Sequence, residues 1–158
     1  MKSDMILWHD SDGCFANFDL QANNLLGCHP SNMDDTTFWA IAKNEPKFWT
    51  TMPLIDGAIE YWNKIKHLNP IILTGAPKDN FEFAEKAKKD WWLEHFNHTN
   101  VIVCLSKNKH TFVTDANDVL VDDTERIVKR FINAGGRAIL HRNYNETLIQ
   151  LYNIGFLF

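Results

Sequence analysis

The stretch ILWHDSDG, from Ile6 to Gly13, joins an apolar run to two aspartates and a glycine. An apolar run buried on both faces is typical of an interior strand of a parallel sheet. Two later stretches repeat this arrangement: IILTG at residues 71–75 and VLVDD at residues 119–123. Ligands of parallel α/β sheets bind outside the carboxyl ends of the strands. We therefore expect the three polar clusters to meet in one crevice.

Strand-like and helix-like segments alternate along the rest of the chain. The periodicity predicts strands at 5–9, 71–73, 101–105, 119–121 and 137–140, and helices at 55–67, 80–97, 124–133 and 145–152. Such alternation predicts an α/β fold with right-handed crossovers, a three-layer sandwich around a parallel sheet. We expect residues 1–158 to form a single domain, with a small helical cap inserted after the first strand at about residues 14–56.

The composition gives the chain no global attraction for nucleic acid. A chain of 158 residues buries roughly two thirds of the surface that its unfolded form exposes. Its formal net charge of −4 argues against binding long nucleic acid over a broad basic surface. Three cysteines without a CxxC spacing favour free thiols in a reducing compartment, and no stretch reaches membrane-spanning length. We expect a cytoplasmic protein that does not enter a membrane.

Asp10 and Asp12 end the first predicted strand, where Gly13 lets the chain turn out of the sheet. Alternation along a strand would place both carboxylates on one side. Such a pair supports phosphoryl transfer, because one carboxylate attacks phosphorus while the other protonates the leaving oxygen and later activates water. The alternative is a solvated turn, since a DxDG motif also occurs by chance.

Two further clusters could complete a phosphate site. Thr74 and Gly75 offer a hydroxyl and loop amides as an anion cradle, although a Thr-Gly pair is often only a turn. Asp122 and Asp123 are adjacent carboxylates at a buried strand end, which repel each other unless a cation lies between them. Hard oxygen ligands suit Mg²⁺. Asp123 could instead begin and cap the next helix.

The ordered set formed by Asp10 to Gly13, Thr74, a lysine near 109 and Asp122-Asp123 resembles the four motifs of the haloacid-dehalogenase (HAD) superfamily of aspartyl-nucleophile phosphatases. Within that superfamily, FWTTMPLIDGA at 48–58, VLVDD at 119–123 and AGG at 134–136 resemble the 5′(3′)-deoxyribonucleotidase branch. The likeness extends over nearly the whole chain and implies a HAD-like fold.

The resemblance also implies roles for individual residues. Asp10 would be the nucleophile and Asp12 the acid and base, while Thr74, Gly75 and Lys109 would bind phosphate. Mg²⁺ would be held by the Asp10 carboxylate, the backbone carbonyl of Asp12, Asp122 and, directly or through water, Asp123. Lys109 is favoured because it directly precedes the Thr-Phe-Val stretch leading to the acidic motif, with Lys107 in reserve. Two differences from the family concern His9, where an apolar residue is usual, and the segment 74–77, which is one residue longer.

Aromatic side chains of the predicted cap could bind a nucleobase. Stacking is typically worth ~1–3 kcal/mol per base in single-strand binders, and the resemblance to nucleotidases suggests this role for Phe18, Phe48 and Trp49. Each ring could equally belong to the core of the cap. Trp91 and Trp92 suit core packing or an interface, so the sequence leaves a homodimer as an alternative to a monomer. His95 and His98 lack the paired cysteines expected of a zinc site.

Taken together, the sequence predicts a Mg²⁺-dependent phosphomonoesterase that acts through an aspartyl-phosphate, with a nucleoside monophosphate as substrate. The first alternative is a phosphatase for another small phosphate ester or for a polynucleotide 3′ phosphate. The second is a catalytically silent phosphate-binding protein on the same fold. Retention of both Asp10 and Asp12 speaks against a silent protein, because binding alone needs neither an attacking group nor an acid.

Overall fold

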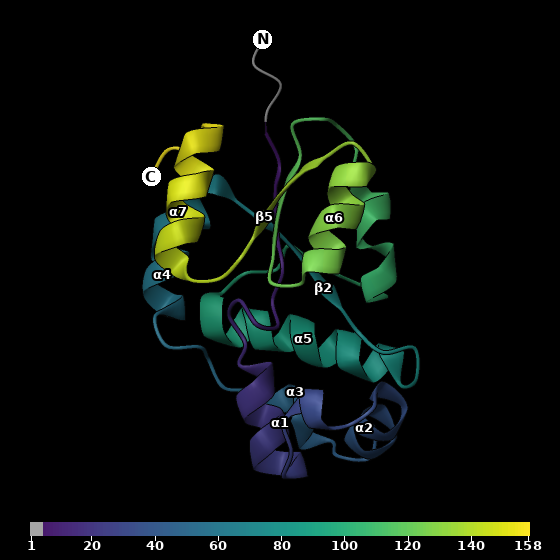
Figure 1. The fold of residues 1–158 in the computed structure, drawn as a ribbon. Helices are drawn as coiled ribbons and strands as arrows, with labels where there is room; N and C mark the ends of the chain where they lie inside the picture. The colour runs from purple at the N-terminus through teal and green to yellow at the C-terminus, as the bar shows by residue number, and fades with distance from the viewer. Residues whose placement is uncertain (1–4) are drawn as a thin grey trace.

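A five-stranded parallel sheet, in the order β3-β2-β1-β4-β5, forms the centre of the computed structural model (Figure 1). The strands are β1 (Leu7–His9), β2 (Ile71–Gly75), β3 (Val101–Cys104), β4 (Val119–Asp122) and β5 (Arg137–Leu140). The structure describes residues 5–158, so the first four residues of the predicted domain lie outside it. The strand order reverses at β1, and such a reversal is where α/β sheets form their ligand crevice.

Helices cover both faces of the sheet. On one face, α6 (Glu125–Asn133) packs Ile127 and Phe131 against alternate strand residues Trp8, Leu73 and Leu120. The other face is covered by α4 (Ala58–Ile65), α5 (Phe81–Phe96) and α7 (Tyr144–Ile154). Its core contains Leu7, Ile72, Val119, Val121 and Ile139. The central strands β1, β2 and β4 thus bury both faces, and the predicted α/β fold class is confirmed.

Local differences from the prediction lie at the end of one helix and in a polar loop. The predicted helix at 55–67 is shorter and ends in the 3₁₀ helix η2 (Lys66–Leu68), because Asn69 takes the left-handed conformation and Pro70 follows. Another 3₁₀ helix, η3 (Ser106–Phe112), was not predicted, since its polar sequence carries no apolar repeat. It is important for the site because it carries Lys109.

Residues between β1 and α4 form α1 (Phe18–Leu26), η1 (Pro30–Asn32), α2 (Asp35–Ala42) and α3 (Lys47–Thr50). In Figure 1 these helices lie together beyond α5, at one end of the molecule. The buried amide of Gln21 donates to the backbone carbonyls of Lys47 and Phe48, which ties α1 to α3. Within residues 5–158, no helix is long and apolar enough to cross a membrane.

Candidate active site

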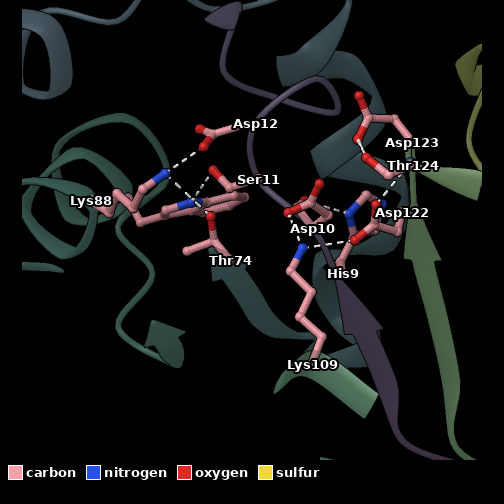
Figure 2. A network of polar contacts seen from close by, with 11 residues as sticks. His9, Asp10, Ser11, Asp12, Thr74, Lys88, Lys109, Asp122, Asp123 and Thr124 are labelled. Atoms are coloured by element: carbon pink, nitrogen blue, oxygen red, sulfur yellow. Dashed lines mark hydrogen bonds and ion pairs between the residues drawn. The ribbon is translucent and has the colours of Figure 1, made fainter. Parts of the chain in front are cut away.

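Carboxylates from β1 and β4 meet around one buried lysine. Lys109 is 2% exposed, and its Nζ donates to Asp10 Oδ1 and to Asp122 Oδ2, each at 2.7 Å (Figure 2). The backbone holds Asp10 close to β4, because the Asp10 N–H donates to the Val121 carbonyl at 2.8 Å. The other Asp122 oxygen accepts from the Thr124 N–H at 2.9 Å. Residues distant in sequence therefore form one ionic cluster.

The charge balance of this cluster appears in its pKa values. Burial and the negative charge of Asp10 raise the pKa of Asp122 to about 6. Desolvation in the crevice, with the charges of Asp10 and Asp122, raises the pKa of Asp123. Burial opposes the charge of Lys109, but the two carboxylates outweigh that effect and raise the pKa of Lys109. The carboxylates outnumber the cation, so the cluster favours binding of a further positive charge.

Two glycines allow the loops to approach closely. At Gly13, where φ is +78°, a Cβ atom would lie within 1.9 Å of Asp123 Oδ2. At Gly75 a Cβ atom would lie within 1.9 Å of Ser106 Oγ. A side chain at either position would push the acidic loop or η3 out of place. Both glycines therefore shape the crevice, because their lack of a side chain lets Asp123 and Ser106 approach the backbone closely.

A cavity of about 500 Å³ opens above the carboxylates, a volume in the range of small-molecule sites. The strand ends contribute Asp10, Asp12, Gly75 and Asp123 to its lining, η3 contributes Lys109, and the inserted helices contribute Phe18, Trp39 and Trp49. Other described residues lining it are Gly13, Asp19, Ala76, Pro77, Lys78, Leu105, Ser106, Lys107, Thr124 and Ile127. Acidic and basic groups thus share one space with aromatic rings.

Two of the predicted ligand-binding residues lie elsewhere. Phe48 is 0% exposed and packs against Phe18, Phe38 and Trp49, so it belongs to the core of the inserted helices and not to the cavity lining. Thr74 is also fully buried and is not among the described lining residues. Trp39 lines the cavity, whereas Phe48, which the sequence analysis suggested for stacking on a nucleobase, does not.

Asp12 belongs to a second ionic group, separate from the first. Its Oδ2 accepts from Lys88 Nζ at 2.5 Å, and Lys88 also donates to Thr74 Oγ1 at 3.3 Å (Figure 2). Beside it, the Trp92 indole N–H donates to Ser11 Oγ at 2.9 Å. Burial raises the pKa of Asp12, while the Lys88 charge lowers it. The two aspartates of the DxDG motif therefore have different cationic partners.

The fold recurs in two solved structures of low sequence identity. A hydrolase from Streptococcus pneumoniae TIGR4 has a TM-score of 0.50 and 12% identity, over 94% of this chain and 98% of that chain. A HAD family hydrolase from Deinococcus radiodurans R1 was solved with bound phosphate and sodium. It has a TM-score of 0.50 and 12% identity, over 96% of this chain and 88% of that chain. No protein with a curated description matches the sequence. These likenesses establish the fold.

The sequence profile of one family decides the assignment. The family described as 5′ nucleotidase, deoxy (pyrimidine), cytosolic type C protein matches residues 5–153. The chain belongs to this family. As a member of this nucleotidase family, it is a phosphoric monoester hydrolase, and the predicted recognition as a HAD-superfamily phosphatase is confirmed.

Sequence reasoning missed Lys88, although a signal for it was present. On α5 the buried positions are Ala84, Ala87, Lys88, Trp91 and Trp92, spaced as one helical stripe. A lysine within an apolar stripe indicates a buried partner, because an unpaired ammonium is costly to bury. The same stripe shows that Trp91 and Trp92 pack within the core of this chain.

His9 lies buried, immediately before Asp10 in the chain. Its Nδ1 bonds to the Asp10 carbonyl at 2.8 Å, and its Nε2 bonds to the Tyr61 hydroxyl at 2.8 Å. A carbonyl only accepts, so Nδ1 carries the proton and Nε2 accepts from tyrosine. Burial lowers the pKa of His9 to about 3. The imidazole is therefore neutral in the folded protein near pH 7.

The buried His9 contributes a loss of stability in mild acid, in the direction opposite to the effect of the raised pKa values of Asp122 and Asp123. Between about pH 6.5 and 3 the unfolded chain binds a proton at His9 that the folded chain does not, so stability is lost as the pH falls through this range. From pH 7 to pH 5 the contribution of His9 to this loss is about 2 kcal/mol, at 1.36 kcal/mol per pKa unit. The difference between the parent and a variant without His9, in urea unfolding at both pH values, measures it.

His9→Asn provides the comparison, because the asparagine amide can still donate to the Asp10 carbonyl. This variant should lose about 2 kcal/mol less than the parent between pH 7 and pH 5. The exposed His67 offers a control on the same chain: His67→Asn should follow the parent. An identical pH dependence in His9→Asn and the parent would contradict the prediction.

Proposed function

We propose that the chain is a Mg²⁺-dependent phosphomonoesterase that forms an aspartyl-phosphate on Asp10 and dephosphorylates (deoxy)nucleoside monophosphates in the cytosol. The observation that carries this proposal is the Asp10 carboxylate. It is 5% exposed, lies 2.7 Å from Lys109 Nζ, and lines a cavity that has aromatic walls. The family description supports the nucleotide substrate and the cytosolic location.

In the first step, an oxygen of Asp10 attacks phosphorus while the bond from phosphorus to the ester oxygen breaks. Asp12, protonated at this stage, donates its proton to the departing oxygen. In the second step, the Asp12 carboxylate takes a proton from water, whose oxygen attacks the phosphorus. The acyl-phosphate bond then breaks, which releases inorganic phosphate and restores Asp10. Burial, which raises the pKa of Asp12, favours the protonated form that the first step needs.

The acidic cluster fits Mg²⁺ by its donor chemistry. Asp10 and Asp123 offer ligand atoms that lie, together with Cys14 Sγ, within 4.8 Å of one another. Hard oxygen donors are the ligands that Mg²⁺ prefers, whereas a thiol is not. Asp10, Asp122, the Asp12 carbonyl and Asp123 would hold the ion. Once bound, Mg²⁺ would neutralise charge on the carboxylates and the substrate phosphate.

The phosphate contacts rest on three predicted residues and on the cavity lining. Lys109 reaches Asp10 directly, which supports its choice over Lys107 as the lysine that neutralises phosphate. Gly75 lines the cavity and offers backbone to an anion. Thr74 would need to exchange its Lys88 contact for a phosphate oxygen. Lys78 and Lys107 add positive charge to the rim of the cavity.

The aromatic wall supports a substrate that carries a ring. Phe18, Trp39 and Trp49 line the cavity, and the rings of Trp39 and Trp49 are stacked at 6.0 Å with 14° between their planes. A nucleobase could extend this stack, since every base offers a π face. The polynucleotide 3′ phosphate alternative lacks support, because no broad basic surface follows from a net charge of −4.

Replacing one cavity ring should separate nucleotide binding from phosphate chemistry. Trp39→Ala is expected to raise KM for a nucleoside monophosphate about 5- to 150-fold, the equivalent of ~1–3 kcal/mol of stacking. KM for p-nitrophenyl phosphate, a smaller ester, should change much less. Steady-state kinetics on both esters measures this. The exposed neighbour Ile41, as Ile41→Ala, should leave both KM values unchanged. Equal losses on both esters would show that Trp39 only supports the fold.

A phosphate-release screen tests the proposed function as a whole. Nucleoside 5′- and 3′-monophosphates are compared with sugar phosphates and p-nitrophenyl phosphate, each with Mg²⁺ and with excess chelator. Nucleotide turnover that requires Mg²⁺ supports the proposal. Turnover of sugar phosphates without nucleotides would favour the alternative small-ester phosphatase. Phosphate binding without turnover of any ester would favour the silent phosphate-binding protein.

A further inference from the structure

Lys88 is a buried cation that contacts three parts of the site. It is 4% exposed, although lysine is almost never buried unless it is paired. Its Nζ lies 2.5 Å from Asp12 Oδ2, 3.3 Å from Thr74 Oγ1, and 4.4 Å from the centre of the Trp49 ring. One side chain of α5 therefore joins the end of β1, the end of β2 and the wall formed by α3.

Packing alone does not account for a lysine at this position. The neighbouring positions on the stripe are alanine and tryptophan, and an apolar residue there would bury surface without desolvating a charge. Replacing a buried ion pair with apolar groups is often neutral or stabilising. The effect of Lys88 on Asp12 is therefore the feature that needs an explanation.

The two buried lysines divide the carboxylates between them. Lys109 contacts Asp10 and Asp122, whereas Lys88 contacts Asp12 on the opposite side of the β1 loop, as Figure 2 shows. Lys88 is not among the described residues that line the large cavity, so it would act on a substrate through another group. Asp12, which does line the cavity, is the group that Lys88 holds.

We propose that Lys88 is a positioning residue that fixes the Asp12 carboxyl group for proton transfer to the leaving oxygen. The inference rests on the proposed function, because it assumes that Asp12 is the acid. The Trp49 ring, packed over the ammonium, limits the movement of Lys88. The ammonium in turn fixes one carboxylate oxygen of Asp12 and leaves the other for the substrate. Lys88 itself transfers no proton.

Two esters that differ in their need for an acid test this role. Benzyl phosphate and p-nitrophenyl phosphate each carry one ring, but only p-nitrophenolate leaves readily without a proton. The ratio kcat/KM reports the steps up to formation of the aspartyl-phosphate. Lys88→Met should lower kcat/KM about 100-fold for benzyl phosphate, because a general acid contributes roughly 10²–10⁴-fold. For p-nitrophenyl phosphate the loss should stay below about 5-fold.

Controls separate positioning from structure. Lys89→Met removes the same charge from an exposed pair with Glu85 on the same helix and should change neither rate. In an Asp12→Asn background, Lys88→Met should cause no further loss on benzyl phosphate, because the group on which it acts is gone. If Lys88→Met shows no cooperative unfolding transition, and so is not folded, Lys88→Gln takes its place in the comparison, because glutamine keeps a hydrogen-bond donor.

The outcomes distinguish this inference from the proposed function. Equal losses on the two esters, or an added loss in the Asp12→Asn background, would overturn the positioning role while leaving the phosphatase intact. A parent protein that hydrolyses neither these esters nor nucleotides would overturn the proposed function, and the role of Lys88 with it. A selective loss on benzyl phosphate that disappears in the Asp12→Asn background supports the positioning role.

Discussion

Replacing Asp10 with asparagine is expected to lower kcat by roughly 10⁴-fold or more, the scale of effect seen when a nucleophile is removed. The amide keeps the shape of the side chain but cannot form the acyl-phosphate. Its oxygen can still accept from Lys109, and Asp122 continues to pair with that lysine. The fold should therefore persist. Phosphate release under saturating substrate measures the loss, and thermal unfolding checks the fold.

A second measurement identifies the intermediate. After rapid acid quench, parent protein mixed with ester should carry covalent phosphate, and Asp10→Asn protein should carry none. Asp90→Asn makes the same chemical change at an exposed carboxylate on α5 and should retain full activity. Near-normal release by well-folded Asp10→Asn protein would exclude Asp10 as the nucleophile.

The fold was predictable because its strands are short apolar runs that end in chemically distinctive residues. The apolar runs at residues 71–73 and 119–121 predict strands that are buried on both faces. The structure places both strands beside β1 in the sheet. The positions of Asp10 and Asp122 at one edge follow from parallel order alone. The bounds of α4 were less predictable, because its last turn tightens into a 3₁₀ helix before Asn69.

The walls of the site were harder to predict than its acidic centre. Phe48 and Trp49 are adjacent in a four-residue helix, which is too short for periodicity to show which ring faces the core. The structure buries Phe48 and brings Trp39 from α2 to the cavity. Lys88 is remote in sequence from every motif, and its partner Asp12 lies 76 residues away. The apolar stripe of α5 indicates that Lys88 is buried, but tertiary packing decides which carboxylate it contacts.

Replacing the Asp122 carboxylate at the end of β4 should strongly weaken the response to Mg²⁺. Asp122→Asn is expected to raise the Mg²⁺ concentration for half-maximal rate by more than about 100-fold, since even residues outside the ligand shell change metal affinity by about 10–100-fold. The asparagine oxygen can still accept from the Thr124 N–H, so the turn after β4 should hold. Initial rate against Mg²⁺ concentration, for parent and variant, measures the shift.

Thermal unfolding provides a readout of the ion that does not depend on turnover. Mg²⁺ should raise the Tm of the parent, because an ion that binds only the folded state stabilises it, and should leave the Tm of Asp122→Asn nearly unchanged. Asp19→Asn is a matched control, since Asp19 lines the same cavity but pairs with His29 on the inserted helices. Its Mg²⁺ response should equal that of the parent.

Full activity in excess chelator, or equal Mg²⁺ titrations for parent and Asp122→Asn, would rule out a metal at this cluster. The excess negative charge around Lys109 would then need another counterion, such as protons on the carboxyl groups of Asp122 and Asp123, whose pKa values are already raised.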